Sequence, residues 1–281
     1  MTLLSTELDD IAAGFAAGTV VPYLGPGMLA LVPGAPVPAT PEALAALMTA
    51  KVSVPHKIRK RLTAAAQFIE NFKHRKSVVA LMNEAFGPQP EPSALHRWLA
   101  RSGVPVLVDT WYDDTLLAAM AAERPDGDWG QVQGLSQSEH FGRWTGVYDA
   151  AGAALDAVPA GAWTTLVYKP IGSHRPAANY LVSDSDHVEV LTEIDIQTPI
   201  PAEVQALRTG RHFLFLGCRF DDQLTRSFAR QVMKRSSERH WAVLPEEPTR
   251  MEARFLAEQQ ITRLPMRLED VAAILAAEAL A

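Results

Sequence analysis

Apolar and polar positions follow two different periods along the chain, and each period predicts one kind of element. Between residues 6 and 17, apolar side chains such as Leu8 and Phe15 recur at the spacing of one helix face. Residues 20–24 form a short, continuous apolar run, which is typical of a strand buried on both faces. The first part of the chain therefore predicts a helix followed by a buried strand.

The same two patterns continue along the rest of the chain. Short apolar runs predict further strands at residues 104–108, 164–168, 213–216, 240–244 and 261–264. Segments with helical spacing predict helices at residues 41–51, 57–73, 75–86, 93–100, 222–235, 249–259 and 268–280. Short buried strands separated by helices are typical of a parallel sheet. We therefore predict an α/β fold, in which a Rossmann-like, doubly wound and mostly parallel sheet carries helices on both faces.

The length of the chain and its local composition limit the possible domain organisation. At 281 residues the chain is long enough to bury a full core, and we expect one domain over residues 1–281. A helical segment at about residues 41–100 separates the first two predicted strands. Residues 32–40 precede it and are rich in Pro, Gly and Ala, which indicates an ordered loop over a pocket or a linker. A polar, glycine-rich stretch at about residues 123–160 is expected to leave the sheet as an irregular excursion.

The charge of the chain narrows the range of partners. The formal net charge is −6 and the isoelectric point is about 5.8, so the protein as a whole does not attract the phosphate backbone of nucleic acid. The basic residues 56–61 are a local exception. We interpret this run as the solvated face of a helix, with a patch for an anionic partner as the alternative.

No segment indicates insertion into a membrane. The first residues lack the basic start and apolar core of a signal peptide. No uninterrupted apolar stretch reaches the roughly 18 residues that span a bilayer. We therefore expect a cytoplasmic protein without a membrane partner.

The sequence contains few residues that could form a metal-binding site. Its one cysteine, Cys218, excludes a disulfide within the chain and a zinc site made of four cysteines. Neighbouring aspartates, such as Asp221 and Asp222, could bind magnesium, but they are better explained as residues at helix starts. We expect no metal.

Glycines directly follow two of the predicted strands. Gly25 and Gly27 come after the strand at residues 20–24, and Gly217 comes after the strand at residues 213–216. Ligands of doubly wound sheets bind at the carboxyl ends of the strands, where glycine turns let backbone amides approach a phosphate. A tight turn also needs glycine for the backbone alone. These residues by themselves leave both interpretations open.

Five segments together resemble the motifs of the sirtuin-like family of bacterial proteins. The family pattern combines a strand with a Gly-Ala-Gly turn, a Thr-Asn-Tyr-Asp sequence, a Lys-Leu-His-Gly-Ser sequence, an acidic helix start and a Phe-Leu-Gly-Tyr-Ser-Phe-x-Asp sequence. The similar segments of this chain follow in the same order, at residues 23–28, 95–113, 167–173, 183–186 and 213–222. The resemblance implies the Rossmann-like fold and NAD or an ADP-ribose-like nucleotide as cofactor, without zinc.

The resemblance also implies which residues would contact that nucleotide. They lie in the loops after four predicted strands: Gly25, Pro26, Gly27, Met28, Thr110, Trp111, Asp113, Gly172, Ser173, Gly217 and Cys218.

The chain departs from the family pattern at the positions that carry out the family's catalysis. The family's Asn and His, which act on the nicotinamide ribose of NAD, correspond to Trp111 and Ile171. Neither side chain accepts a proton or orients a water molecule, so the family's general-base route is absent. Met28 replaces a small hydroxyl residue, and Pro26 offers no amide N–H to a phosphate. We therefore expect no catalytic residue at the family's positions and favour a protein that binds without turnover.

Three residues elsewhere are weaker candidates for a catalytic group. His174 lies three residues after Ile171, and His96 precedes the second predicted strand. The ordinary pKa of histidine suits proton transfer, but a histidine in a polar loop is more often a surface hydrogen-bonding group. Cys218 follows a buried strand, where a thiol is more often a packing residue.

Three hypotheses follow. The first is a catalytically degenerate sensor or regulatory module that binds NAD or a related adenine nucleotide. The second is a protein–protein interaction module, in which Met28, Trp111 and Ile171 fill the pocket and residues 56–61 or 123–146 engage a partner. The third is an NAD glycohydrolase with repositioned residues. A homo-oligomer is compatible with all three, and the resemblance suggests a setting in NAD-linked defence, signalling or nitrogen fixation.

Overall fold

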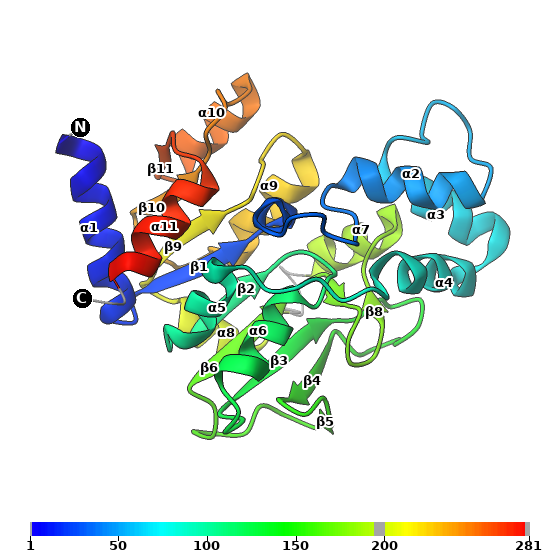
Figure 1. Ribbon diagram of the computed structural model, residues 1–281. Coiled ribbons are helices and arrows are strands. Elements are labelled where there is room, and N and C mark those ends of the chain that lie inside the picture. The colour runs from blue at the N-terminus through cyan, green and yellow to red at the C-terminus, as the bar shows by residue number, and fades with distance from the viewer. Residues whose placement is uncertain (1, 194–199, 279–281) are drawn as a thin grey trace.

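One large β-sheet organises the molecule (Figure 1). The structure is a computed structural model that describes residues 2–193 and 200–278. The sheet contains β1 (Val20–Leu24), β2 (Val106–Asp109), β3 (Trp129–Gly134), β4 (Thr145–Asp149), β5 (Ala154–Leu155), β6 (Thr165–Lys169), β9 (His212–Leu216), β10 (His240–Val243) and β11 (Ile261–Leu264). Their order is β11-β10-β9-β1-β2-β6-β3-β4-β5. Strands β11 to β3 in this order are parallel, and β4 and β5 are antiparallel at one edge. The predicted mostly parallel α/β sheet is confirmed, and the six predicted strands are β1, β2, β6, β9, β10 and β11.

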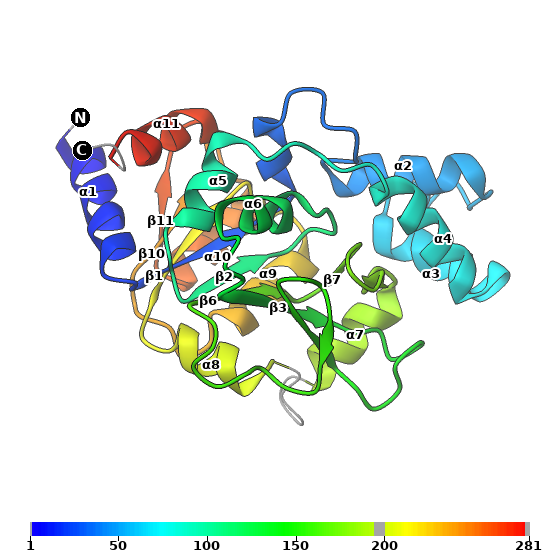
Figure 2. The ribbon, with the colours of Figure 1, turned by 60° about the horizontal axis from the view of Figure 1, so that its bottom comes forward.

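Helices cover both faces of this sheet (Figures 1 and 2). One face carries α1 (Thr2–Ala16), α5 (Ala94–Arg101), α6 (Thr115–Glu123) and α11 (Leu268–Glu278). The other face carries α7 (Asp184–Glu193), α8 (Ala202–Arg208), α9 (Gln223–Val232) and α10 (Arg250–Glu258). No described helix has both the length and the apolar character needed to cross a membrane.

The side chains of β1 show why the sheet needs two helical layers. Val20 and Leu24 pack into the core beside α1, α5 and α11, whereas Val21 and Tyr23 pack into the core on the opposite face. All five residues of the strand are buried. A parallel strand of this kind has no face left for water, because alternate side chains enter two different cores.

Three further helices form a segment beside the sheet, at the right of Figure 1. They are α2 (Pro41–Lys51), α3 (Leu62–Lys73) and α4 (Arg75–Phe86). Thr40 begins α2 as the sequence predicts, since its side chain accepts a hydrogen bond from the Ala43 amide at 3.1 Å. The helix α3 also packs against α7, which joins this segment to the rest of the molecule.

The stretch at residues 123–160 does not leave the sheet, so the expectation of an irregular excursion is wrong. It contains β3, β4 and β5, and β3 pairs in parallel with β6. Its polar residues are buried but bonded: Gln133 donates to Gln131 at 2.8 Å and accepts from Asn179 at 2.9 Å. Gly130 is needed because Trp163 packs where a side chain would stand. Polar residues that pair with one another therefore form a buried strand here.

The basic residues 56–61 do not form a helix face, which also corrects the sequence interpretation. Residues 56–60 form turns, and α3 begins only at Leu62. A helix starting at residue 57 would place Lys57 one turn from both Lys60 and Arg61. Like charges at these spacings destabilise a helix, and the turns separate them.

Candidate functional site

The carboxyl ends of β9, β1, β2 and β6 lie side by side, as their order in the sheet requires. The loops that follow these strands are joined by backbone hydrogen bonds. The amide of Gly25 donates to Leu216 at 2.9 Å, and the amide of Thr110 donates to Leu24 at 2.9 Å. The structure therefore brings the predicted contact residues of the loops after β1, β2 and β9 together at one edge of the sheet.

Gly25, Gly27 and Gly217 allow two of these loops to touch. A side chain added at Gly25 would lie 2.5 Å from the carbonyl oxygen of Gly217, and one added at Gly27 would lie 2.7 Å from it. The amide of Gly27 donates to that same carbonyl at 2.9 Å, and the amide of Met28 donates to Gly25 at 3.1 Å. These glycines serve the contact between loops, and the amides expected to face a phosphate are bonded within the protein.

Pro26 and Met28 belong to a short 3-10 helix, η1 (Pro26–Leu31), that follows Gly25. Met28 is buried and packs with α1, α5 and α11, while Trp111 and Ile171 pack in the core on the other face of the sheet. Met28 therefore does not fill the same space as Trp111 and Ile171, which corrects that part of the filled-pocket hypothesis.

Trp111 lies at the end of β2 beneath the loop that leads to α2. Its indole Nε1–H donates to the carbonyl of Pro38 at 2.8 Å, and the side chain is only 4% exposed. Its ring also meets Phe86 from α4 and Tyr112, with ring centres 5.9 and 5.1 Å apart. Trp111 thus joins the strand end, the loop at residues 32–40 and the helical segment.

Ile171, Gly172 and Ser173 form the loop after β6. Gly172 and Ser173 make up β7 (Gly172–Ser173), which pairs with β8 (Asn179–Tyr180). Gly172 has a φ of 83°, and a side chain there would strike the carbonyl of Asn179 at 2.1 Å. Ser173 is fully buried and donates to Asp114 at 3.2 Å. The predicted contact residues of this loop are engaged in building the hairpin.

A buried ion pair supports the turn that carries Trp111. Lys169 Nζ lies 2.5 Å from Asp109 and donates to the carbonyl of Asp113 at 3.0 Å. Burial raises the pKa of Asp109 to about 6, although Lys169 opposes this shift. Asp109 also accepts from the Trp111 amide at 3.2 Å, and Asp113 accepts from the amide of Thr115 at 2.9 Å. These charges fix the shape of the loop.

The three weaker catalytic candidates each contact other groups of the protein. His96 is buried and bonded to Ser93 at 2.7 Å, and burial lowers its pKa to about 4, so it is neutral near pH 7. His174 shares a hydrogen bond of 2.9 Å with the hydroxyl of Tyr180. Burial raises the pKa of the Cys218 thiol far above its usual value, which removes the thiolate needed for nucleophilic attack.

Arg75 connects the helical segment to the sheet. Its guanidinium lies 2.8 Å from Asp186, 3.3 Å from Glu70 and 3.0 Å from Glu139, and it also donates to the carbonyl of Tyr180. Only 10% of its side chain is exposed. Burial opposes ionisation of Asp186, but Arg75 and several hydrogen bonds still hold the pKa of Asp186 below its usual value.

Two hollows of the structure lie away from the strand ends. One, of about 290 Å³, lies beside α2; the other, of about 320 Å³, lies between α9 and α10. Neither is lined by the glycines or by Trp111. Within the described residues, no group of three or more His, Cys, Asp or Glu side chains is placed to hold a metal ion.

Comparison with known protein families shows which family the chain is related to. The SIR2-like domain matches residues 105–264, which is more than half of the chain. The chain belongs to the SIR2-like domain family. No curated protein was found to match it. In this SIR2-like protein the matched residues include the loops after β2, β6 and β9, whereas Gly25, Gly27 and the whole helical segment lie outside the match.

A SIR2-like domain implies an NAD-related ligand, and the strand-end residues of this SIR2-like protein do not fit one as they are packed. The amides of Gly25, Gly27 and Met28 already donate to protein carbonyls. The indole of Trp111 and the side chain of Ile171 are buried in the core at the same edge. In this arrangement these three amides are not free to donate to a phosphate.

The residues that hold this SIR2-like site together are not predicted from the sequence. Lys169 and Asp109 end neighbouring buried strands, and opposite charges at such positions are the signal that could have indicated their pairing. Arg75 gave no signal of its long-range role, because Glu139 and Asp186 are far away in the sequence. Asp186 was expected only as part of an acidic helix start, and it does accept amide hydrogen bonds ahead of α7.

Proposed function

We propose that this SIR2-like protein does not consume NAD and acts by binding. Trp111 and Ile171, at the family's catalytic positions, are 4% and 9% exposed and carry no group that could move a proton. His96 and Cys218 offer no substitute, because burial keeps His96 neutral and the thiol of Cys218 protonated. The chemistry available at this sheet edge therefore supports recognition without turnover.

The hydrogen bond between Trp111 and Pro38 carries the proposal. It closes the strand end with the protein's own side chain and ties that side chain to the loop leading into α2. NAD or a related adenine nucleotide would have to displace Trp111 and this loop in order to bind. Binding would then change the position of the helical segment, which is what a sensor or regulatory module requires.

The test is thermal unfolding with NAD, ADP-ribose, ATP and AMP, together with measurement of released nicotinamide. A ligand at about 100 times its dissociation constant adds roughly 2.7 kcal/mol to the free energy of unfolding. We expect one of these nucleotides to raise the melting temperature without nicotinamide release. Trp111→Ala, which removes the competing side chain, is expected to bind the same nucleotide more tightly.

Two controls make this experiment decisive. Trp98→Ala removes a tryptophan from the opposite face, where Trp98 packs with Phe15, and should leave nucleotide affinity unchanged. Nicotinamide release by the wild type that disappears in His174→Ala would overturn the proposal in favour of an enzyme. A melting temperature that no nucleotide shifts, even in Trp111→Ala, would overturn nucleotide binding.

The last outcome would favour a second candidate function, a protein interaction module with a permanently closed site. Large apolar side chains are exposed on the described surface: Phe141 is 94%, Phe72 66% and Val188 58% exposed. Each of these side chains leaves apolar surface available for contact with a partner. The loop that carries Phe141 is held in place by the ion pair between Glu139 and Arg75.

A further inference from the structure

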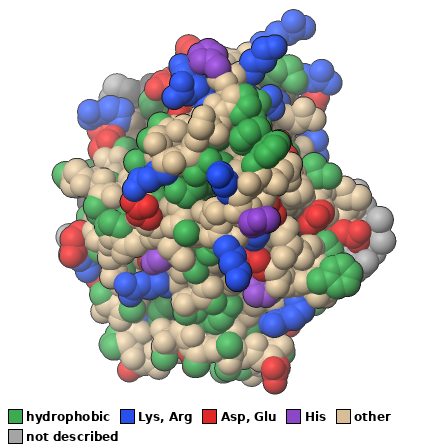
Figure 3. Space-filling view, turned by 90° about the vertical axis from the view of Figure 1, so that its right-hand side faces the viewer, with side chains coloured by type: hydrophobic (Ala, Val, Ile, Leu, Met, Phe, Trp, Pro, Cys, Tyr) green, Lys and Arg blue, Asp and Glu red, His purple; other side chains and the backbone are tan. Residues whose placement is uncertain are grey.

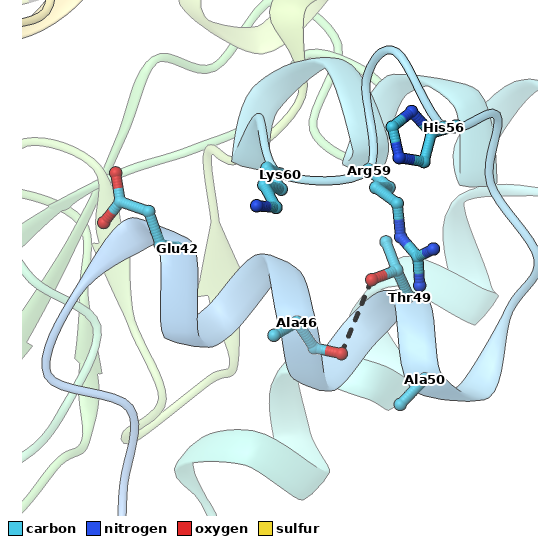
Figure 4. Close-up of a pocket in the computed structure, with 7 residues that line it drawn as sticks. All are labelled: Glu42, Ala46, Thr49, Ala50, His56, Arg59 and Lys60. Carbon is cyan, nitrogen blue, oxygen red and sulfur yellow. Dashed lines mark hydrogen bonds between the residues drawn. The ribbon is translucent and has the colours of Figure 1, made fainter.

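Helix α2 and the turns before α3 enclose a hollow of about 290 Å³ (Figure 4). Ala46, Thr49 and Ala50 form its floor on α2, and Glu42, also on α2, lines it away from Arg59. His56, Arg59 and Lys60 stand over it from the turns, and the guanidinium of Arg59 extends towards Thr49 in Figure 4. The hollow therefore combines a floor of small side chains with a basic wall.

The basic wall lacks internal partners. Lys57, Arg59, Lys60 and Arg61 are exposed, and none of them forms an ion pair with a carboxylate in the part of the chain that the structure describes. Lys51 nearby differs, since it lies 2.6 Å from Glu84. Figure 3 shows Lys and Arg side chains gathered at the upper end of this face. In a protein with a net charge of −6, such a cluster creates a local positive potential that only an outside group can neutralise.

The exposed face of α2 next to this wall is apolar. Ala43, Ala46, Leu47 and Ala50 are exposed and follow one another at helical spacing. Leu47 is 49% exposed. Side chains this small let a second helix approach closely, and their spacing matches the ridge of a packed helix.

We propose that α2 and residues 56–61 form a docking face for an amphipathic, acidic helix of a partner protein. Its apolar side would lie on Ala46, Leu47 and Ala50, and its carboxylates would pair with Arg59 and Lys60. Opposite charges beside an apolar seat give both orientation and affinity. This inference goes beyond the proposed function and does not depend on nucleotide binding.

The hollow favours an acidic helix over a nucleic acid. No Phe, Tyr or Trp side chain lines it, so base stacking, which supplies much of the binding of single strands, would rest on His56 and Arg59 alone. The net charge of −6 also repels a long polyanion more than a short acidic segment, whose charges can be confined to the basic wall.

The experiment measures fluorescence anisotropy of a labelled synthetic helix of about 18 residues with leucines on one face and glutamates beside them. We expect wild-type protein to bind this peptide, and a version with glutamine in place of glutamate to bind at least tenfold more weakly. Arg59→Glu with Lys60→Glu should also weaken binding by about tenfold or more. Ala46→Arg should weaken it similarly, because the new side chain fills the hollow although it adds a positive charge.

The matched control is Lys73→Glu with Lys76→Glu, which changes the net charge equally at exposed positions outside the hollow. Binding by this variant should equal that of the wild type, and circular dichroism checks that every variant is folded. Absence of peptide binding by the wild type, or equal binding by all variants, overturns the proposal. So does tighter binding of a single-stranded oligonucleotide that Ala46→Arg strengthens, or a wild-type dimer that Arg59→Glu with Lys60→Glu dissociates.

Discussion

Trp111 combines two roles in one side chain. Under the proposed function it replaces the family's catalytic Asn, and its Nε1–H satisfies the buried carbonyl of Pro38. A buried carbonyl without a partner costs more than the bond gains, because it has lost water as well. The substitution that the proposed function assigns to this position therefore also stabilises the loop above the site.

Trp111→Phe should keep the ring contacts but leave the carbonyl of Pro38 without a partner. We expect a loss of about 1–3 kcal/mol in the free energy of unfolding, measured by urea denaturation. Trp98→Phe is the control, since Trp98 is buried against Phe15 and no hydrogen bond of its indole contributes. Equal losses in both variants would show that ring volume, and not the Pro38 bond, makes Trp111 stabilising.

At the scale of elements, the helical segment is attached to the sheet by charge as well as by packing. Arg75, at the start of α4, pairs with Asp186 at the start of α7 over a sequence distance of 111 residues. The pair is almost entirely buried. Removing one partner of a buried ion pair leaves an uncompensated charge, whereas removing both leaves none.

Arg75→Met is expected to cost about 3–5 kcal/mol in the free energy of unfolding. Combining it with Asp186→Asn should cost less than the sum of the two single losses by at least about 1 kcal/mol. Urea denaturation of the four proteins measures this coupling. The exposed pair of Arg254 and Glu258, 2.7 Å apart on α10, is the control and should show a coupling of only about 0.3–0.5 kcal/mol. Additive losses for Arg75 and Asp186 would contradict the role of their ion pair.

The elements that the sequence predicts well are those whose own residues decide them. The strand at Val20–Leu24 and the helix at Pro41–Lys51 have the predicted bounds, because a continuous apolar run and a Thr-Pro start are local signals. The strand β3 escaped prediction because Gln131 and Gln133 look exposed in sequence and are paired only in the folded molecule. The helices α6 and α8 were not predicted either.

The candidate site also has some features that the sequence predicts and others that it does not. Glycines after strands indicated where the loops meet, and the structure places Gly25 and Gly217 in contact there. The sequence could not indicate that these glycines serve contact between two loops, because that depends on the register of β1 with β9. The bond from Trp111 to Pro38 crosses 73 residues and has no local signal at all.

At the scale of the whole molecule, buried titratable groups set the response to acid. Burial lowers the pKa of His96 and of His240 to about 4, so unfolding takes up protons between pH 6.5 and 4. Their stabilisation is present above pH 6.5 and is lost as the pH falls towards 4. Asp109 acts in the opposite direction, because its raised pKa of about 6 favours the folded, protonated form as the pH falls through 6. The two histidines therefore predict a loss of stability between pH 6.5 and pH 4, which Asp109 partly offsets.

His240→Asn should flatten this loss. The neutral imidazole of His240 accepts a hydrogen bond from the Phe213 amide at 2.9 Å, and protonation at that nitrogen removes the acceptor. Asparagine can accept the same bond without titrating. We expect the variant to lose roughly 2–3 kcal/mol less than the wild type between pH 7 and pH 4, measured by urea denaturation across the range. His56→Asn, at an exposed position, is the control; if it flattens the profile as much, burial of His240 is not the cause.

The two edges of the sheet bear on how copies of this protein can meet. One edge is β5, a strand of two residues. The other is β11, where the side chain of Arg263 donates to the carbonyls of Leu244 and Pro245. A long, open edge invites strand addition and aggregation, and short or charged edges discourage it. Self-association by extending the sheet from molecule to molecule is thus disfavoured, and contacts between copies have to form through side-chain surfaces.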